Sequence, residues 1–264
     1  MDRLGLGYED VRAVHPGVIY VSVSGFGNRD DSPYREWPAY ASIVEAMSGI
    51  YAWAQRPGEP PRPNPMGAIG DISSALFAVI GILAALRHRD RTGVGQYVDI
   101  AMLDAVVAMT DVVSNLYSLG QRPDEPLPMI LDAFLAEDGY LSMQVVREHQ
   151  FVALVKLIDK PEWADDPRFA ERIGWAEHLE SDIRPAIEAW LVDKTRLEAT
   201  ELLSKVGIAA GPVHTSPEII ADEHVAKRHM IVEMERTDGG ADPVLIPGNP
   251  VKLSAVAEGP ETRI

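Results

Sequence analysis

The chain has 264 residues, of which 46% are hydrophobic, so its length suits one large domain or two smaller ones. It carries 24 basic against 40 acidic side chains, and this acidic excess argues against nucleic acid or an anionic membrane surface as partners. The absence of cysteine excludes disulfides, thiolate metal sites and cysteine nucleophiles, and it agrees with a cytoplasmic location.

The first part of the chain alternates helical and strand-like segments. A helix is expected from Tyr8 to Val14, followed by a strand over residues 18–24. The β-branched residues of that strand show little alternation, which is typical of a strand buried on both faces. Glycines at 25 and 27 follow it, at the kind of strand exit where α/β proteins place ligand sites. Residues 39–51 favour a helix, and residues 55–67, rich in Pro and Gly, predict a loop.

The strongest helical pattern begins after Gly70. Apolar residues recur there at helical spacing: Ile72, Leu76, Val79, Ile80, Leu83 and Leu86. The lack of polarity before Arg87 predicts burial on most sides, and the apolar segment over residues 72–86 is too short to span a bilayer. No signal peptide is visible. A strand over 96–100 and a second apolar helix over 101–119 follow, and this order predicts an α/β architecture.

The rest of the chain divides into two further segments. We predict a large domain over residues 1–122, a smaller α+β domain over 123–213, and a return to the large domain over 214–264. The expected elements are a strand over 139–145, helices around 148–158, 176–191 and 196–205, and short strands over 231–234, 244–246 and 251–253.

Asp71 is the strongest candidate for a catalytic residue, and two interpretations of it compete. Asp is a favoured N-cap residue, so its place at the start of the apolar helix favours a structural role. The same carboxylate can instead attack a thioester carbonyl and form a mixed anhydride. Gly70 before it would let a bulky thioester approach the backbone. Position alone favours the cap.

Other chemistries have less support. The seven His are scattered and form no His-x-x-x-His pair, so no metal site is expected. No Gly-x-Ser-x-Gly sequence is present, which argues against a serine hydrolase. Gly93 and Gly95 lack the third glycine of a nucleotide-binding fingerprint, so a tight turn is expected there.

Several blocks, taken together, resemble the class III coenzyme A (CoA) transferases, the family of formyl-CoA transferase, carnitine CoA-transferase and α-methylacyl-CoA racemase. The resemblance covers nearly the whole chain. The blocks are Val21–Gly27, Glu45–Gly49, Gly70-Asp71, His88–Asp99 and Met102–Ala105, with Asp165–Phe169 and Gly211–Val213 later in the chain.

The resemblance implies a function and a set of site residues. Asp71 would be the nucleophile that attacks an acyl-CoA thioester, giving an aspartyl anhydride and then an aspartyl-CoA thioester from which a carboxylate acceptor collects the CoA. Tyr40, Met102 and Gly70 would contact CoA or substrate. The CoA thioester is a substrate, and no permanently bound cofactor is implied. The implied fold is a nucleotide-binding-like α/β large domain with a smaller domain, in an interlocked homodimer.

Three departures from the family qualify this expectation. Family members carry a longer segment before the residues matching Leu4–Tyr8, so the resemblance predicts a partial large domain that lacks the usual N-terminal part. Pro38 stands where some transferases have a basic CoA contact, and the active-site loop expected between residues 123 and 134 is not recognisable.

Two alternatives to a complete transferase stay open. One is an acyl-CoA racemase or isomerase, although the His-Asp pair of that branch is replaced by Tyr40-Ala41. The other is a non-catalytic truncated chain or a subunit that needs a partner. Aggregation or tight oligomerisation is expected if a sheet edge is left open.

Overall fold

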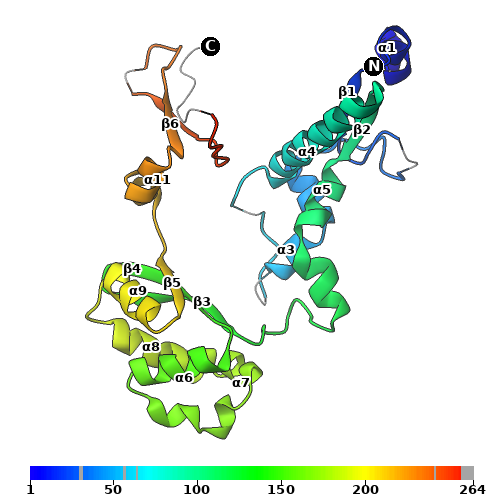
Figure 1. The fold of residues 1–264 in the computed structure, drawn as a ribbon. Coiled ribbons are helices and arrows are strands. Elements are labelled where there is room, and N and C mark those ends of the chain that lie inside the picture. The colour runs from blue at the N-terminus through cyan, green and yellow to red at the C-terminus, as the bar shows by residue number, and fades with distance from the viewer. Residues whose placement is uncertain (30–31, 56–57, 64, 241, 257–264) are drawn as a thin grey trace. The chain divides into compact units, whose positions relative to one another are not determined.

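The computed structural model describes residues 1–29, 32–55, 58–63, 65–240 and 242–256. The chain forms two compact units, Met1–Pro126 and Leu127–Ile264, and Figure 1 labels many of their elements. Among the described residues, one parallel sheet and two antiparallel sheets combine with helices, which confirms the predicted α/β class. The three-part division at residues 122 and 213 and the interlocked homodimer stay predictions.

The first unit is built around two parallel strands. Strand β1 pairs with β2 in register from Ile19↔Gln96 to Ser24↔Ala101. The helix α4 connects to β2 through the Gly93 turn and packs along both strands, as Figure 1 shows. The elements of this unit are η1 (Asp2–Leu4), α1 (Tyr8–Val14), β1 (Ile19–Ser24), α2 (Ala41–Met47), α3 (Ile50–Trp53), α4 (Ile69–Thr92), β2 (Gln96–Ala101), α5 (Met102–Met109) and the π-helical η2 (Val112–Leu116).

Two predicted helices of this unit are interrupted. The helix expected over residues 39–51 is split into α2 and α3 at Gly49, whose φ of +90° cannot continue a helix. The apolar helix expected over 101–119 ends at Met109, and the chain continues as the π-helical turn η2. The apolar spacing continues across both breaks, so periodicity alone did not reveal them.

The long helix α4 departs from expectation in its burial and its length. We expected burial on most sides, but five of its large apolar residues are 54–61% exposed: Ile72, Leu76, Val79, Ile80 and Leu83. Phe77, Ile82 and Leu86 are half-buried. The helix spans 24 residues, which is long and apolar enough to cross a membrane by length and composition. The expectation that the apolar segment is too short to do so is therefore wrong for the helix as folded. A single such helix in the described part of the chain is weak evidence for a membrane span.

The second unit packs a well-filled core. Strands β3, β4 and β5 form an antiparallel sheet, and β6 pairs with β7 in a separate two-stranded sheet. The strand β3 was not predicted, because its apolar residues follow directly on a Pro-rich stretch. The strand expected over 251–253 is not formed. The strands are β3 (Ile130–Ala136), β4 (Gly139–Val145), β5 (Ala209–Pro212), β6 (Ile231–Met234) and β7 (Val244–Pro247).

Most helices of the second unit share one buried cluster with β3 and β4, to which α10 and α11 contribute no described residue. Trp175 lies at its centre, stacks on Phe151 with ring centroids 4.6 Å apart, and donates its Nε1 hydrogen to the carbonyl of Phe169. The longer helices are α6 (Glu148–Leu157), α8 (Arg184–Leu191) and α9 (Arg196–Lys205); the shorter ones are η3 (Pro161–Ala164), η4 (Pro167–Phe169), α7 (Arg172–Glu177), η5 (Leu179–Ile183), α10 (Ser216–Ile220) and α11 (Glu223–Lys227).

Arg196 joins separate parts of the second unit electrostatically. Its guanidinium donates to Glu218 at 2.5 Å and to the carbonyl of Val213 at 2.8 Å, and its backbone N–H donates to Asp138 at 2.7 Å. The Arg196 guanidinium and the Thr215 hydrogen bonds lower the pKa of Glu218 to about 2. The start of α9 is thereby tied to the β3–β4 turn and to α10.

Candidate active site

Asp71 is the third residue of α4. The N-cap is Ala68, whose own side chain makes no capping hydrogen bond, so the interpretation of Asp71 as the cap is wrong. Its carboxylate is exposed in the first helical turn. The unpaired N–H groups and the dipole of a helix N-terminus stabilise negative charge there. The carboxylate of Asp71 is therefore accessible to solvent and does not cap the helix.

Gly70 lies where two helices come closest. A Cβ atom at this position would be 2.9 Å from Cγ2 of Val44 and 3.0 Å from Cα of Ala41 in α2. The second of these is a backbone contact that cannot move aside. The glycine is buried, so its small size serves the packing of α4 on α2. We had expected it to leave room for a thioester.

Tyr40 and Met102 lie at the starts of α2 and α5, and they differ in exposure: Tyr40 is exposed, whereas Met102 is buried. Tyr40 is the N-cap residue of α2, is 76% exposed, and directly precedes Ala41. Met102 begins α5 and is buried in a small cluster with Phe26, Val44 and Val106. Val44 packs in this cluster and also faces Gly70. The first turns of α2, α4 and α5 thus bring the four predicted site residues into one region, although their roles stay predictions.

A cavity of about 580 Å³ opens at the carboxyl ends of β1 and β2. Parallel strands commonly place ligand sites at this edge. Phe26, Tyr34 and Leu103 line the cavity and also belong to, or pack against, the cluster that contains Met102. The remaining lining residues are Gly27, Arg29, Ser32, Asp99, Ala101 and Asp104.

Asp99 organises the loop that borders this cavity. Its Oδ2 accepts the backbone N–H groups of Asn28 and Arg29, both at 2.9 Å. The turn before them is possible because Gly27 adopts a φ of +88°. The other oxygen, Oδ1, is buried without a hydrogen-bond partner among the described residues. Asp99 belongs to the His88–Asp99 block, but no local pattern indicated this contact with the loop that follows β1.

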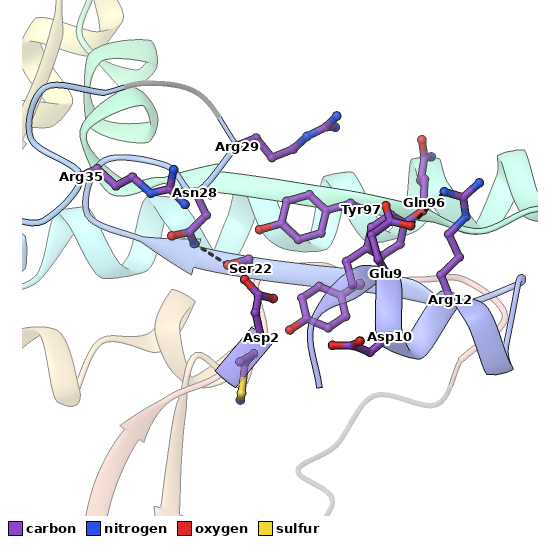
Figure 2. Close-up of a pocket in the computed structure, with 13 residues that line it drawn as sticks. Asp2, Glu9, Asp10, Arg12, Ser22, Asn28, Arg29, Arg35, Gln96 and Tyr97 are labelled. Atoms are coloured by element: carbon purple, nitrogen blue, oxygen red, sulfur yellow. Dashed lines mark hydrogen bonds and ion pairs between the residues drawn. The ribbon is translucent and has the colours of Figure 1, made fainter. Parts of the chain in front are cut away.

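A second cavity, of about 930 Å³, is lined by residues of α1, β1 and β2 and is shown in Figure 2. The rings of Tyr8, Tyr20 and Tyr97 meet there with centroids 5.4–6.0 Å apart. The guanidinium of Arg29 lies 5.7 Å from the ring centroid of Tyr97, and Asn28 donates to the hydroxyl of Ser22. Arg29 lines both cavities, whereas Asp71 lines neither.

A buried acid adjoins the predicted nucleophile and was missed from the sequence. Glu45 in α2 is 2% exposed, and its carboxylate accepts the N–H of Gly70 at 3.2 Å and the hydroxyl of Tyr51 at 2.9 Å. An acid in the middle of a short amphipathic helix is normally expected to face solvent. The only feature of the sequence that drew attention to Glu45 was its place in the Glu45–Gly49 block, and that feature did not indicate burial.

No three His, Asp or Glu side chains in the described parts of the chain come together in a way that could hold a metal ion. The clearly shifted carboxylates lie in the second unit, where contacts with arginine or lysine lower the pKa of Asp138, Asp166, Asp193 and Glu218. The Ser181 hydroxyl, followed by Arg168, lowers the pKa of Asp182. These acids form ion pairs at the surface of that unit.

Residues 1–262 match the family described as CoA-transferase family III. The chain belongs to this family. It is 32% identical over 247 residues to succinyl-CoA–D-citramalate CoA-transferase of Chloroflexus aurantiacus, covering 91% of this chain and 60% of the relative. It is 33% identical over 260 residues to acetyl-CoA:oxalate CoA-transferase of Acetobacter aceti, covering 96% and 64%. The chain therefore spans less than two thirds of the length of these two curated relatives.

Solved structures support the same family. A CAIB/BAIF family protein from Brucella suis superimposes with a TM-score of 0.75 at 29% identity, covering 96% of this chain and 66% of that chain. Rv3272 from M. tuberculosis gives a TM-score of 0.79 at 27% identity, covering 97% and 68%. The recognition of a class III CoA-transferase from the sequence blocks is thus confirmed.

Proposed function

We propose that this family III chain takes part in moving CoA from an acyl-CoA donor to a carboxylic acid acceptor, with Asp71 as the nucleophile. Family membership supports the reaction class, since the relatives named above are CoA-transferases that act on different acid pairs. The observation that carries the assignment of Asp71 is its exposed carboxylate in the first turn of α4, directly after the tightly packed Gly70.

The proposed reaction begins when a carboxylate oxygen of Asp71 attacks the thioester carbonyl. A C–O bond forms, the C–S bond breaks, and CoA leaves as a thiolate, which gives an acyl-aspartyl anhydride. The thiolate then attacks the aspartyl carbonyl, releasing the donor acid and leaving an aspartyl-CoA thioester. The acceptor carboxylate attacks the aspartyl carbonyl of this thioester, which breaks the C–S bond and forms a second mixed anhydride. The released CoA thiolate then attacks the acceptor carbonyl of that anhydride, which forms the acceptor thioester and breaks the C–O bond to Asp71. Asp71 returns as a free carboxylate, so no redox partner or net proton is needed.

The binding part of the proposal uses the edge of the sheet. The cavity at the carboxyl ends of β1 and β2 offers aromatic and apolar walls from Phe26, Tyr34 and Leu103, with the cation of Arg29 at its margin. The apolar walls suit the apolar arm of CoA and Arg29 suits a phosphate, while the carboxylates of Asp99 and Asp104 in the same lining do not favour phosphate. Tyr40 and Met102 would contact the CoA near Asp71. A homodimer and a cytoplasmic location belong to the same proposal.

A transfer reaction agrees better with these residues than racemisation does. Racemisation requires a base that removes the α-proton. At the position where the racemase branch carries its His-Asp pair, this chain has Tyr40 and the buried Ala41, and Ala41 packs on Gly70. The side chain of Ala41 has no group that could take up a proton.

Trapping with hydroxylamine tests the proposal. When the full chain is incubated with succinyl-CoA or acetyl-CoA and then hydroxylamine, we expect a hydroxamate on Asp71, located by peptide mass spectrometry. The Asp71→Asn variant should show none and should lose transferase activity by about a thousandfold or more, as removal of a nucleophile does. Because Asp71 is exposed, its unfolding midpoint should remain close to that of the unmodified chain. A hydroxamate found elsewhere, or equal trapping in Asp71→Asn, would remove Asp71 from this role.

A further inference from the structure

Glu45 is the one charged side chain among the described residues that is buried. Burying a carboxylate costs free energy unless hydrogen bonds replace its hydration. Both of its oxygens have a donor: Oε1 accepts from the Gly70 N–H and Oε2 from the Tyr51 hydroxyl. This buried acid contacts Gly70, the residue that precedes the proposed nucleophile.

Both backbone polar groups of Gly70, the N–H and the carbonyl, are hydrogen-bonded to side chains. Its N–H donates to Glu45, and its carbonyl accepts the hydroxyls of Ser73 and Ser74, at 3.3 and 2.6 Å. All three of these side chains are buried. The close approach of Gly70 to Ala41 and Val44 restricts it from a third direction. The backbone that leads into Asp71 is therefore fixed from within, while the Asp71 carboxylate itself is exposed.

We propose that Glu45 is a positioning residue for the transfer reaction: it anchors the Gly70 N–H and thereby sets the direction in which the Asp71 carboxylate leaves α4. This inference rests on the proposed function of Asp71. A displacement of about 1 Å at a reacting group can lower a rate by roughly a hundredfold. Loss of Glu45 also leaves the buried Gly70 N–H without an acceptor, so the first turn of α4 is expected to shift or fray.

The test compares Glu45→Ala, Glu45→Gln and Ser48→Ala in the full chain. Glutamine keeps an oxygen for the Gly70 N–H, whereas alanine removes it. Ser48 is a matched control, because it is also buried at the end of α2 and donates to the carbonyl of Glu45 at 2.7 Å without contacting Gly70. The rate of hydroxamate formation on Asp71 with succinyl-CoA or acetyl-CoA is measured as a function of acyl-CoA concentration, together with hydrogen exchange of peptides that contain residues 69–72.

For Glu45→Ala we expect the maximal trapping rate to fall by about ten- to a hundredfold. The acyl-CoA concentration at half-maximal rate should stay within about threefold, since a positioning residue leaves ground-state binding largely intact. Hydrogen exchange over residues 69–72 should be faster in Glu45→Ala than in Ser48→Ala. Glu45→Gln should restore most of the trapping rate and most of the protection from exchange.

The outcomes separate this inference from the proposed function. Trapping at the unmodified rate in Glu45→Ala, or equal losses in Glu45→Ala and Ser48→Ala, would overturn the role of Glu45 and leave Asp71 as the nucleophile. Failure of the unmodified chain to form any hydroxamate would overturn the proposed function and this inference together. Unchanged exchange over residues 69–72 in Glu45→Ala would show that Glu45 does not hold this turn.

Discussion

Two helices with the same apolar spacing have opposite fates in this molecule. In the second unit, Ile183, Ile187 and Leu191 recur every four residues through η5 and α8, and all three are fully buried. In the first unit, Ile72, Leu76 and Ile80 recur at the same interval in α4 and are 55–60% exposed. The spacing determines which residues share a helix face. Whether that face is buried depends on the elements that pack against it.

The difference in exposure between α8 and α4 follows from the elements that pack against each helix. In the second unit, α8 packs on β3 and shares one cluster with the neighbouring helices, so its apolar stripe is covered. In the first unit, α4 packs on β1, β2, α2 and α5, which cover its small residues Ser73, Ser74, Ala78 and Ala85. The large apolar residues lie on the other side of the helix, where the described part of the chain offers no partner.

A matched pair of leucines should show the largest difference between the two units. Leu191→Ala removes a fully buried side chain from the second unit and should lower the free energy of unfolding by about 2–5 kcal/mol. Leu76→Ala in α4 removes a side chain that is 55% exposed and should lower it by less than about 0.5 kcal/mol. Urea unfolding followed by tryptophan fluorescence measures both. Equal losses would show that the α4 face is covered in solution.

A pair of glycines tests whether close packing occurs at the proposed site. Gly70→Ala introduces a Cβ atom 3.0 Å from the backbone of Ala41, so we expect a loss of about 1–3 kcal/mol in stability. The trapping rate at Asp71 should fall with it, because α4 must move away from α2. In Gly211→Ala, in the second unit, the added methyl group meets no atom within 4 Å, and stability should be nearly unchanged. A harmless Gly70→Ala would indicate that the two helices are less closely packed than described.

The ion pairs of the second unit should produce the smallest effect, visible as a pH dependence. Arg196 lowers the pKa of Glu218 to about 2 in the folded chain, below the value near 4.5 expected when unfolded. A depressed folded-state pKa stabilises the fold above the unfolded value, and this contribution is lost as pH falls through about 4.5 toward about 2. The melting temperature of Glu218→Gln should therefore lie below that of the unmodified chain at pH 7 and approach it at pH 3. Parallel melting curves across this range would contradict the assignment.

Local patterns in the sequence predicted much of the fold correctly. The helix Tyr8–Val14 and the strands Gly139–Val145 and Ile231–Met234 are formed with the predicted bounds. These segments combine a clear period with turn residues at both ends, so their boundaries depend on nearby residues. The strand β3 was missed because its apolar residues follow directly on a Pro-rich stretch, so that only the pairing with β4 identifies it as a strand.

The candidate site was predictable only in part. The block resemblance identified Asp71, Tyr40, Met102 and Gly70, and the structure brings their elements together around α2. The burial of Glu45 and the hydrogen bonds of Asp99 were not predictable, because each joins residues far apart in the chain: 25 positions separate Glu45 from Gly70, and 71 separate Asp99 from Asn28.

Motifs and local patterns were enough to identify the family, the α/β class and the position of the apolar helix that follows Gly70. Contacts between distant elements were needed to show that Asp71 is not the helix cap, that Gly70 makes room for α2, and that five large apolar side chains of α4 are exposed. Periodicity and turn residues act over only a few neighbouring positions. Burial and close approach are set by the distant elements that share the same space.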